Sequence, residues 1–151
     1  MAQCRIGDVL IRRAGSGDLS TVMAVEAACF DEERYSRDLV LFMLSDEEFA
    51  SFLAEEGAVA GVATVHVKDR EAHLVSIGVV PERRGRGVAG ALMDAAELEA
   101  VARGASRMEL QVSVLNVAAM NMYLRRGYRV THLLKGYYGG IKDAYLMERA
   151  L

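Results

Sequence analysis

Arginine and glycine are concentrated in one short stretch, residues 77–89, in a pattern that suits the binding of an anion. The stretch begins as the end of an apolar run, passes through Pro81, the only proline of the chain, and opens into an amphipathic helix predicted to begin near Val88. Glycine lets a backbone approach a ligand closely, and the first N–H groups of a helix have no partner within it. The turn therefore offers several donors and a positive dipole end to a phosphate. Positive charge is added by Arg83, Arg84 and Arg86.

A sheet with helices on its faces is predicted to hold this turn, because strand and helix patterns alternate along the chain. Apolar residues recur at every second position in the predicted strands and at spacings of three and four in the predicted helices. Strands are expected over residues 9–12, 49–53, 58–67, 72–80, 108–114, 128–134 and 144–148, helices over 18–29, 36–45, 88–103 and 117–126, and a glycine-rich loop over 135–140. The order predicts a mixed α/β sheet in one domain that spans residues 1–151.

Composition excludes several classes of protein. The 151 residues carry a formal net charge of −3, whereas a general nucleic-acid binder carries a basic excess. Neither Cys4 nor Cys29 lies in a disulfide framework or a metal-ligand spacing, so no metal site is expected. No apolar run approaches the roughly 18 residues of a membrane span, and the first residues lack the apolar core of a signal peptide. We therefore expect a cytoplasmic protein that binds neither nucleic acid nor membrane.

Two motifs after the apolar strand resemble those of the GNAT superfamily of acyl-CoA-dependent N-acyltransferases. Residues 84–89 match its pyrophosphate loop, R/Q-x-x-G-x-G/A, and residues 116–128 match its later signature, N-x-x-A-x-x-x-Y-x-x-x-G-F/Y. One glycine loop alone would be weak evidence, but both motifs occur in the right order on the right predicted elements. The resemblance implies the GNAT fold, a mixed and mostly antiparallel sheet flanked by about four helices. The second motif is carried by Asn116, Ala119, Tyr123, Gly127 and Tyr128.

The resemblance extends to N-terminal acetyltransferases, namely the RimI-like enzymes and the NatA-type catalytic subunits of archaea. Residues 73–77, 134–138 and 143–147 look like that subgroup's sequence, and residues 30–35 resemble its peptide-side loop. It implies an acetyl-CoA-dependent enzyme that acetylates the α-amino group of protein N-termini, of ribosomal-protein or nascent-chain type. The amine would attack directly within a ternary complex, and no auxiliary subunit is implied.

The resemblance also implies which residues hold acetyl-CoA. In such folds the backbone of the central strand binds the pantetheine arm, and the amides of the turn bind the pyrophosphate. Asn116 would bond to the cofactor, although it is also suited to cap its own helix. The predicted cofactor-binding residues are Ile77, Gly78, Val79, Arg84, Gly85, Arg86, Gly87, Val88, Ala89, Asn116 and Tyr123.

Tyr123 resembles the family's tyrosine that protonates the departing CoA thiolate. A thiol with a pKa of about 8.5 leaves as a thiolate at neutral pH, where a phenol with a pKa of about 10 is still protonated and able to donate. A tyrosine at this place can also simply pack in the apolar face of its helix.

The predicted base departs from the family's pattern. Many relatives carry glutamate within L-E-V on the strand before Asn116, but Gln111 stands at that position here and can at most position a water. His73 matches a histidine of archaeal relatives and has an intrinsic pKa of about 6.5, which suits a base at neutral pH. Glu109, on the same strand face as Gln111, is a further candidate.

The acceptor is expected to bind on the other side of the sheet. Aromatic side chains would wall a peptide groove, and a carboxylate would lie close to the incoming ammonium. The groove would use Tyr35, Tyr137 and Tyr138, the carboxylate would be Glu32 or Glu33, and Glu26 is a further candidate at the substrate mouth.

Two other functions remain open from the sequence. A small-molecule amine or antibiotic acetyltransferase shares every cofactor feature and differs only in the acceptor groove. A CoA-binding regulatory module with weak catalysis is suggested by Gln111 in place of glutamate.

Overall fold

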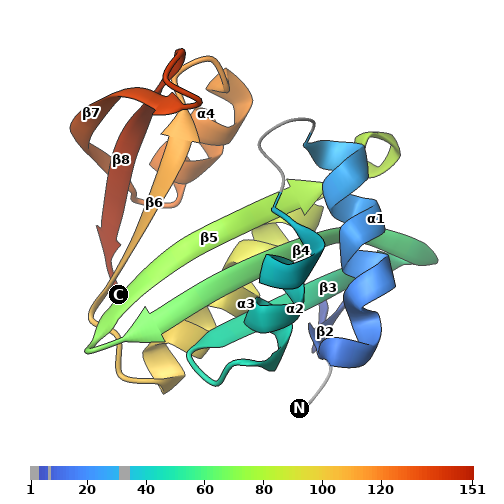
Figure 1. Ribbon diagram of the computed structural model, residues 1–151. Helices are drawn as coiled ribbons and strands as arrows, with labels where there is room; N and C mark the ends of the chain where they lie inside the picture. The colour runs from blue at the N-terminus through green and yellow to red at the C-terminus, as the bar shows by residue number, and fades with distance from the viewer. Residues whose placement is uncertain (1–3, 7, 31–34) are drawn as a thin grey trace.

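Eight strands and four α-helices occur in the structure, a computed structural model that describes residues 4–6, 8–30 and 35–151 (Figure 1). The strands are β1 (Cys4–Ile6), β2 (Val9–Ala14), β3 (Phe49–Glu56), β4 (Ala58–Lys68), β5 (Glu71–Val79), β6 (Arg107–Ser113), β7 (Arg129–Tyr138) and β8 (Lys142–Ala150). The α-helices are α1 (Leu19–Cys29), α2 (Arg37–Ser45), α3 (Val88–Ala102) and α4 (Val117–Arg125), and short 3-10 turns lie at Ser16–Asp18 and Pro81–Arg83. None of the helices in these described ranges is long and apolar enough to cross a membrane.

The strands form one sheet in the order β1-β2-β3-β4-β5-β6-β8-β7. Neighbouring strands are antiparallel except β5 and β6, which are parallel. These two pair only from Glu71 to Leu74 and from Arg107 to Leu110; beyond that point they separate, as the two ribbons do in Figure 1. We call the space between the separating strands the fork. The mixed, mostly antiparallel sheet predicted from the sequence is confirmed.

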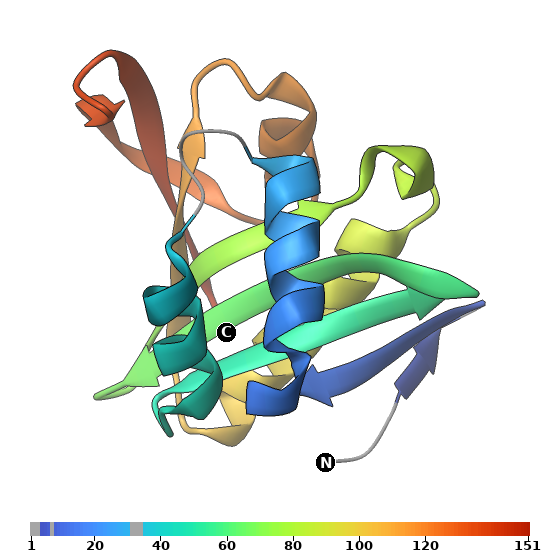
Figure 2. The same cartoon turned by 45° about the vertical axis from the view of Figure 1, so that its right-hand side comes forward.

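Helices cover both faces of the sheet (Figure 2). On one face, α1 and α2 pack through an apolar cluster that includes Val22, Val25, Val40 and Met43. On the other face, α3 buries Leu92 and Met93 completely, and Tyr123 of α4 belongs to the same cluster. The strand β5, one side of the fork, is therefore contacted by α1 from one face and by α3 from the other.

Three segments differ from the predicted elements by more than two residues. The edge strand β1 was not predicted, and β3 continues to Glu56, three residues beyond its expected end. The loop predicted at 135–140 is wrong for its first four residues, because β7 runs on to Tyr138 and pairs there with Lys142. The pairing register shifts along this stretch, and Gly136 has a φ of +62°. Pairing with β8 thus overrides the local glycine signal.

Candidate active site

A β-bulge in β5 lies where the fork begins. Thr64 of β4 pairs with Ser76, and Val65 pairs with Leu74, so Val75 is an extra residue on β5. A bulge bends its strand and strengthens the local twist. The bulge therefore accompanies the point at which β5 leaves β6.

Beyond the bulge, β5 presents backbone groups to the fork. On the side that faces β4, the N–H of Val80, directly after β5, donates to the carbonyl of Ala60 at 2.8 Å. Hydrogen-bonded pairs alternate with non-hydrogen-bonded pairs in an antiparallel ladder, so Gly78 also bonds to β4. Ile77 and Val79 then direct their N–H and C=O groups away from β4, into the fork, where the Val79 carbonyl already accepts from Arg84 Nε at 2.9 Å. The N–H and C=O of Ile77 and the N–H of Val79 are the groups left to face a ligand. These are the groups expected to bind a pantetheine arm.

The turn before α3 fits a diphosphate through its backbone. Gly85 and Gly87 have φ values of +77° and +82°, in the left-handed region that glycine tolerates best. No side chain caps the first N–H groups of α3. Val88, only 1% exposed, anchors the start of the helix in the core. The free N–H groups and the positive end of the helix dipole are thereby held in a fixed position.

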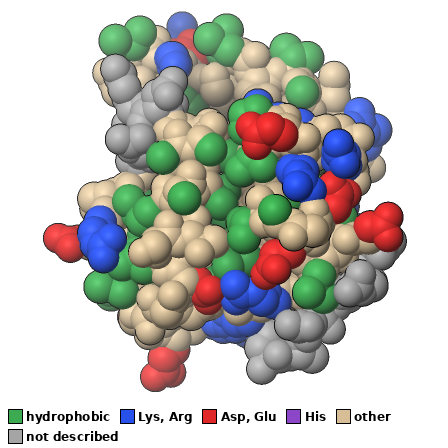
Figure 3. All heavy atoms as spheres, turned by 90° about the vertical axis from the view of Figure 1, so that its right-hand side faces the viewer, with side chains coloured by type: hydrophobic (Ala, Val, Ile, Leu, Met, Phe, Trp, Pro, Cys, Tyr) green, Lys and Arg blue, Asp and Glu red, His purple; other side chains and the backbone are tan. Residues whose placement is uncertain are grey.

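The three arginines of the turn are engaged within the protein. Arg84 Nε donates to the carbonyl of Val79 at 2.9 Å. Arg83 and Arg86 both approach Glu56 at the end of β3, with Nη1–Oε1 distances of 3.3 and 3.2 Å, and Arg83 also donates to the Glu56 carbonyl. Basic and acidic side chains accordingly lie next to one another on the face shown in Figure 3. Glu56 was not among the predicted site residues, because it lies between the two strands predicted at 49–53 and 58–67.

Tyr123 and Asn116 both lie on α4. Tyr123 is 3% exposed, and its ring packs edge-on against Tyr128 with the centroids 5.8 Å apart. Burial, and to a lesser extent the neighbouring Tyr138, raise the pKa of the Tyr123 phenol. The phenol therefore stays protonated at neutral pH, as an acid must. Asn116 caps α4, its Oδ1 accepting from the N–H of Ala119 at 3.2 Å.

His73 and Gln111, two separate candidates in the sequence, are hydrogen-bonded to each other. His73 Nε2 lies 2.6 Å from Gln111 Oε1, across the start of the fork. An amide oxygen only accepts, so Nε2 donates in this bond, and in the neutral form of the ring Nδ1 carries the lone pair. Glu109 is in register with His73 in the paired part of the strands. The histidine thus has one nitrogen available as a base and the other held by Gln111.

Three tyrosines predicted to line a peptide groove, Tyr35, Tyr137 and Tyr138, come from two distant parts of the chain. Tyr35 Oη donates to the carbonyl of Val75, the bulge residue, at 3.1 Å. Burial, and then the nearby Tyr137 and Glu26, raise the pKa of Tyr35. Tyr137 packs edge-on against Tyr138 with the ring centroids 4.9 Å apart. Tyr35 and Tyr137 are thus close together, whereas Glu32 and Glu33 lie outside the described residues.

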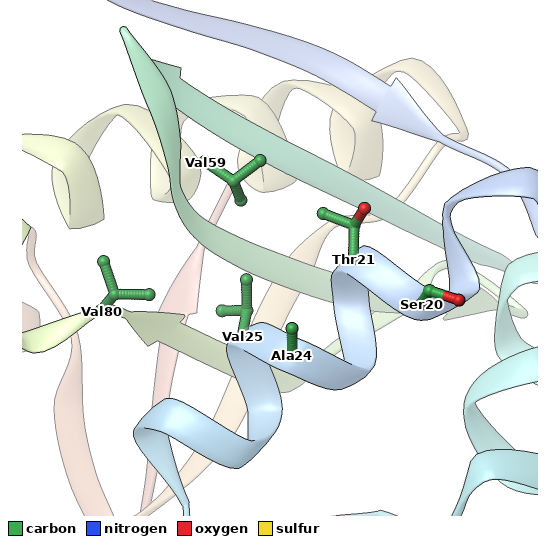
Figure 4. A pocket seen from close by; sticks show the side chains of 6 residues that line it. All are labelled: Ser20, Thr21, Ala24, Val25, Val59 and Val80. Atoms are coloured by element: carbon green, nitrogen blue, oxygen red, sulfur yellow. The ribbon is translucent and has the colours of Figure 1, made fainter.

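A hollow elsewhere on α1 offers less chemistry (Figure 4). It lies between α1 and the strand ends at Val59 and Val80. None of its six lining side chains is an acid or a base near neutral pH, so they cannot move a proton between reactants. The lining residues are Ser20, Thr21, Ala24, Val25, Val59 and Val80.

Comparison with known proteins agrees with this arrangement. Residues 19–128 match the model of the acetyltransferase (GNAT) family. An uncharacterized N-acetyltransferase of Methanocaldococcus jannaschii is 33% identical over 141 residues, 92% of this chain and 90% of that protein. An N-alpha-acetyltransferase of Saccharolobus solfataricus is 37% identical over 84 residues, which cover 54% of this chain and 50% of that protein.

Among solved structures, the ribosomal-protein-S18-alanine N-acetyltransferase of Escherichia coli superposes with a TM-score of 0.85 at 25% identity, covering 94% of this chain and 93% of that one. Enzymes of this family use acetyl-CoA as the acetyl donor, and the free backbone groups of β5 and α3 fit that molecule. The chain belongs to the GNAT family of acetyltransferases.

Proposed function

We propose that the protein acetylates the α-amino group of protein N-termini. The observation that carries the proposal is the His73–Gln111 pair, a weak base without a carboxylate. An α-amino group with a pKa of about 7.7 to 8.0 is roughly one-tenth neutral at pH 7, so its deprotonation costs about 1 kcal/mol. Deprotonating a lysine side chain, whose pKa is about 10.4, costs more than about 4 kcal/mol. Such a base suits an N-terminal amine better than a lysine. The names of the Saccharolobus and Escherichia relatives support this acceptor class.

Each group of residues has a part in the proposed reaction. Acetyl-CoA supplies an acetyl group activated as a thioester. Ile77 and Val79 hold its arm by their backbone groups, and the N–H groups at the start of α3 hold the diphosphate. His73 takes a proton from the amine, and Tyr123 gives one to the leaving sulfur. Tyr35, Tyr137 and Tyr138 line the groove of the peptide, and a cytoplasmic location would give access to new chains.

The test uses the purified protein, acetyl-CoA and peptides that begin with Ser, Ala or Met and contain an internal lysine. Tandem mass spectrometry locates each acetyl group. Acetylation of the first residue is expected, and the same peptides with a blocked N-terminus are expected to remain unmodified. Acetylation found only on lysine, or on no peptide, contradicts the proposal.

Gly87→Ala is expected to weaken acetyl-CoA binding about tenfold, because a side chain at a φ of +82° strains the turn by about 1 to 2 kcal/mol and shifts its N–H groups. Isothermal titration calorimetry measures the Kd. Gly17→Ala is the matched control: Gly17 lies in the 3-10 turn before α1, has no positive φ, and its added Cβ meets no atom within 4 Å, so the Kd should not change. Wild-type affinity in Gly87→Ala would remove the turn from the cofactor site.

His73→Ala and Gln111→Ala are each expected to lower kcat about 10- to 100-fold, and the double variant should be no slower than the slower single one. The reason is that the two side chains act as one hydrogen-bonded unit. Initial rates over a range of pH provide the measurement, and His66→Ala, whose ring bonds Glu48 instead, is the control. If the loss of kcat in the double variant equals the product of the two single losses, the two residues act separately. A pH profile of His73→Ala that superimposes on wild type would point to a water positioned by Gln111.

A further inference from the structure

One buried carboxylate next to the fork has no part in the reaction described so far. Glu26, on the sheet side of α1, is 4% exposed. Its Oε1 accepts from Ser76 Oγ at 3.2 Å, while its buried Oε2 has no hydrogen-bond partner and no ion pair among the described residues involves it. A buried, underbonded carboxylate costs free energy, and an apolar side chain would fill this space at lower cost.

The carboxylate is connected to the acceptor side through Ser76. Ser76 follows the bulge residue Val75 and precedes Ile77, whose backbone faces the fork. Tyr35, a proposed wall of the peptide groove, bonds the carbonyl of Val75. Ser76 itself is partly exposed. A serine hydroxyl has one proton and two lone pairs, and that proton points to Glu26, so toward the groove Ser76 Oγ can only accept.

The proposed reaction requires such an acceptor. An ammonium group must lose two protons to become an amide with one N–H. His73 takes the first, which frees the nucleophile, but the second leaves as the new N–C bond forms. Tyr123 cannot take it at that stage, because its phenol is still protonated until the C–S bond breaks.

We propose that Ser76 and Glu26 form a relay that removes this second proton. As nitrogen bonds to the acetyl carbon, its proton passes to Ser76 Oγ while the serine proton passes to Glu26 Oε1. The electron pair of the broken C–S bond stays on sulfur, which receives the Tyr123 proton. Two protons are gained, by His73 and Glu26, and one is lost, by Tyr123, so one is released to solvent per turnover. The inference rests on the proposed function, in which an amine attacks at the fork.

The electrostatic surroundings suit this role. Burial raises the pKa of Glu26, opposed by the Ser76 hydrogen bond. Tyr35 and, on α1 itself, Cys29 have their pKa values raised in part by Glu26, and both are neutral at pH 7. Among the described residues, no charged group contributes to the shift of the Glu26 pKa, whereas Arg84 and Glu82 act on Cys29 of the same helix. A raised pKa lets the carboxyl group accept a proton near neutral pH and return it.

The test compares kcat over pH 5.5 to 9 for wild type, Glu26→Gln, Ser76→Ala and Ser76→Thr, with the amine saturating. Gln keeps the hydrogen bond from Ser76 but cannot take a proton. Glu26→Gln and Ser76→Ala should be about 10- to 100-fold slower and lose one ionisation from the acid limb, whereas Ser76→Thr, which keeps the hydroxyl, should stay within about threefold of wild type. The Kd of acetyl-CoA should not change.

Two results overturn the relay: a kcat of Glu26→Gln within twofold of wild type, or a lower kcat with an unchanged pH profile, which would leave Glu26 only a structural part of the bulge. If the enzyme acetylates only lysines or small amines, the proposed function fails and the same series on that amine still decides the relay. If it acetylates no amine, infrared spectroscopy decides whether the relay stands. The band of the Glu26 carboxyl group is the one that is absent from the Glu26→Gln spectrum. Titration of that band above the ordinary range of a glutamate carboxyl supports the relay, and titration within that ordinary range contradicts it.

Discussion

Tyr123→Phe should lower kcat by about 100- to 1000-fold while leaving the Kd of acetyl-CoA nearly unchanged. The substitution removes one oxygen from a side chain that is 3% exposed and keeps the ring packed against Tyr128. Because burial raises the pKa of the phenol, Tyr123 is protonated throughout the neutral range and can donate to the leaving sulfur. Without it, the sulfur has to leave as an unassisted thiolate.

Pre-steady-state and steady-state rates with a reactive peptide measure the Tyr123 effect, and calorimetry measures the Kd. Tyr145→Phe on β8 is the matched control, since Tyr145 packs at the edge of the same core and has no assigned role. It should keep wild-type kcat. A Tyr123→Phe enzyme as fast as wild type would remove Tyr123 from the acid role and leave it as a core residue.

Glu97→Ala should destabilise the fold by about 3 kcal/mol, the largest effect on stability that we expect. Glu97 on α3 accepts from Arg126 at 2.7 Å, from Tyr128 Oη at 2.7 Å and from Arg149 at 3.0 Å. It thereby joins α3 to the end of α4 and to β8, which hold Tyr123 in place. Removing the carboxylate leaves two guanidinium groups and a phenol without their shared acceptor.

Urea denaturation at pH 7 measures this loss, which corresponds to a melting temperature lower by about 6 to 12 °C for a chain of this size. The control is Asp94→Ala, which removes another partner of Arg126, at 2.6 Å. Its side chain is 47% exposed, so its loss should cost less than about 1 kcal/mol. Equal losses from the two substitutions would show that burial does not set the strength of this network.

The backbone features proposed to bind the cofactor were predictable from the sequence because they are local. Gly85 and Gly87 take positive φ values, and α3 starts directly after them, so a short motif encodes the whole feature. The strands and helices were predicted in the right order for the same reason: their periodicity is local. The short β1 was missed because three residues carry too little pattern.

The acceptor half was less predictable because it depends on contacts between distant segments. Glu26 and Ser76 are 50 positions apart, so no local pattern predicts the hydrogen bond between them. The bulge at Val75 follows from the register between β4 and β5, which no local pattern in β5 shows. The hydrogen bond between His73 and Gln111 likewise needs β5 and β6 to be neighbours, although they are separated by α3.

The fork also bears on how the protein avoids self-association. Ile77 and Val79 expose backbone donors and acceptors of the kind that, on the outer edge of a sheet, recruit strands from other molecules. Here they line the inside of a wedge closed at Leu74 and Leu110 by four paired residues on each strand. A flat strand from another chain cannot enter a narrowing wedge along its full length, but a thin, flexible ligand can. The open hydrogen-bonding edge is thus kept for a small molecule and shielded from aggregation by its own geometry.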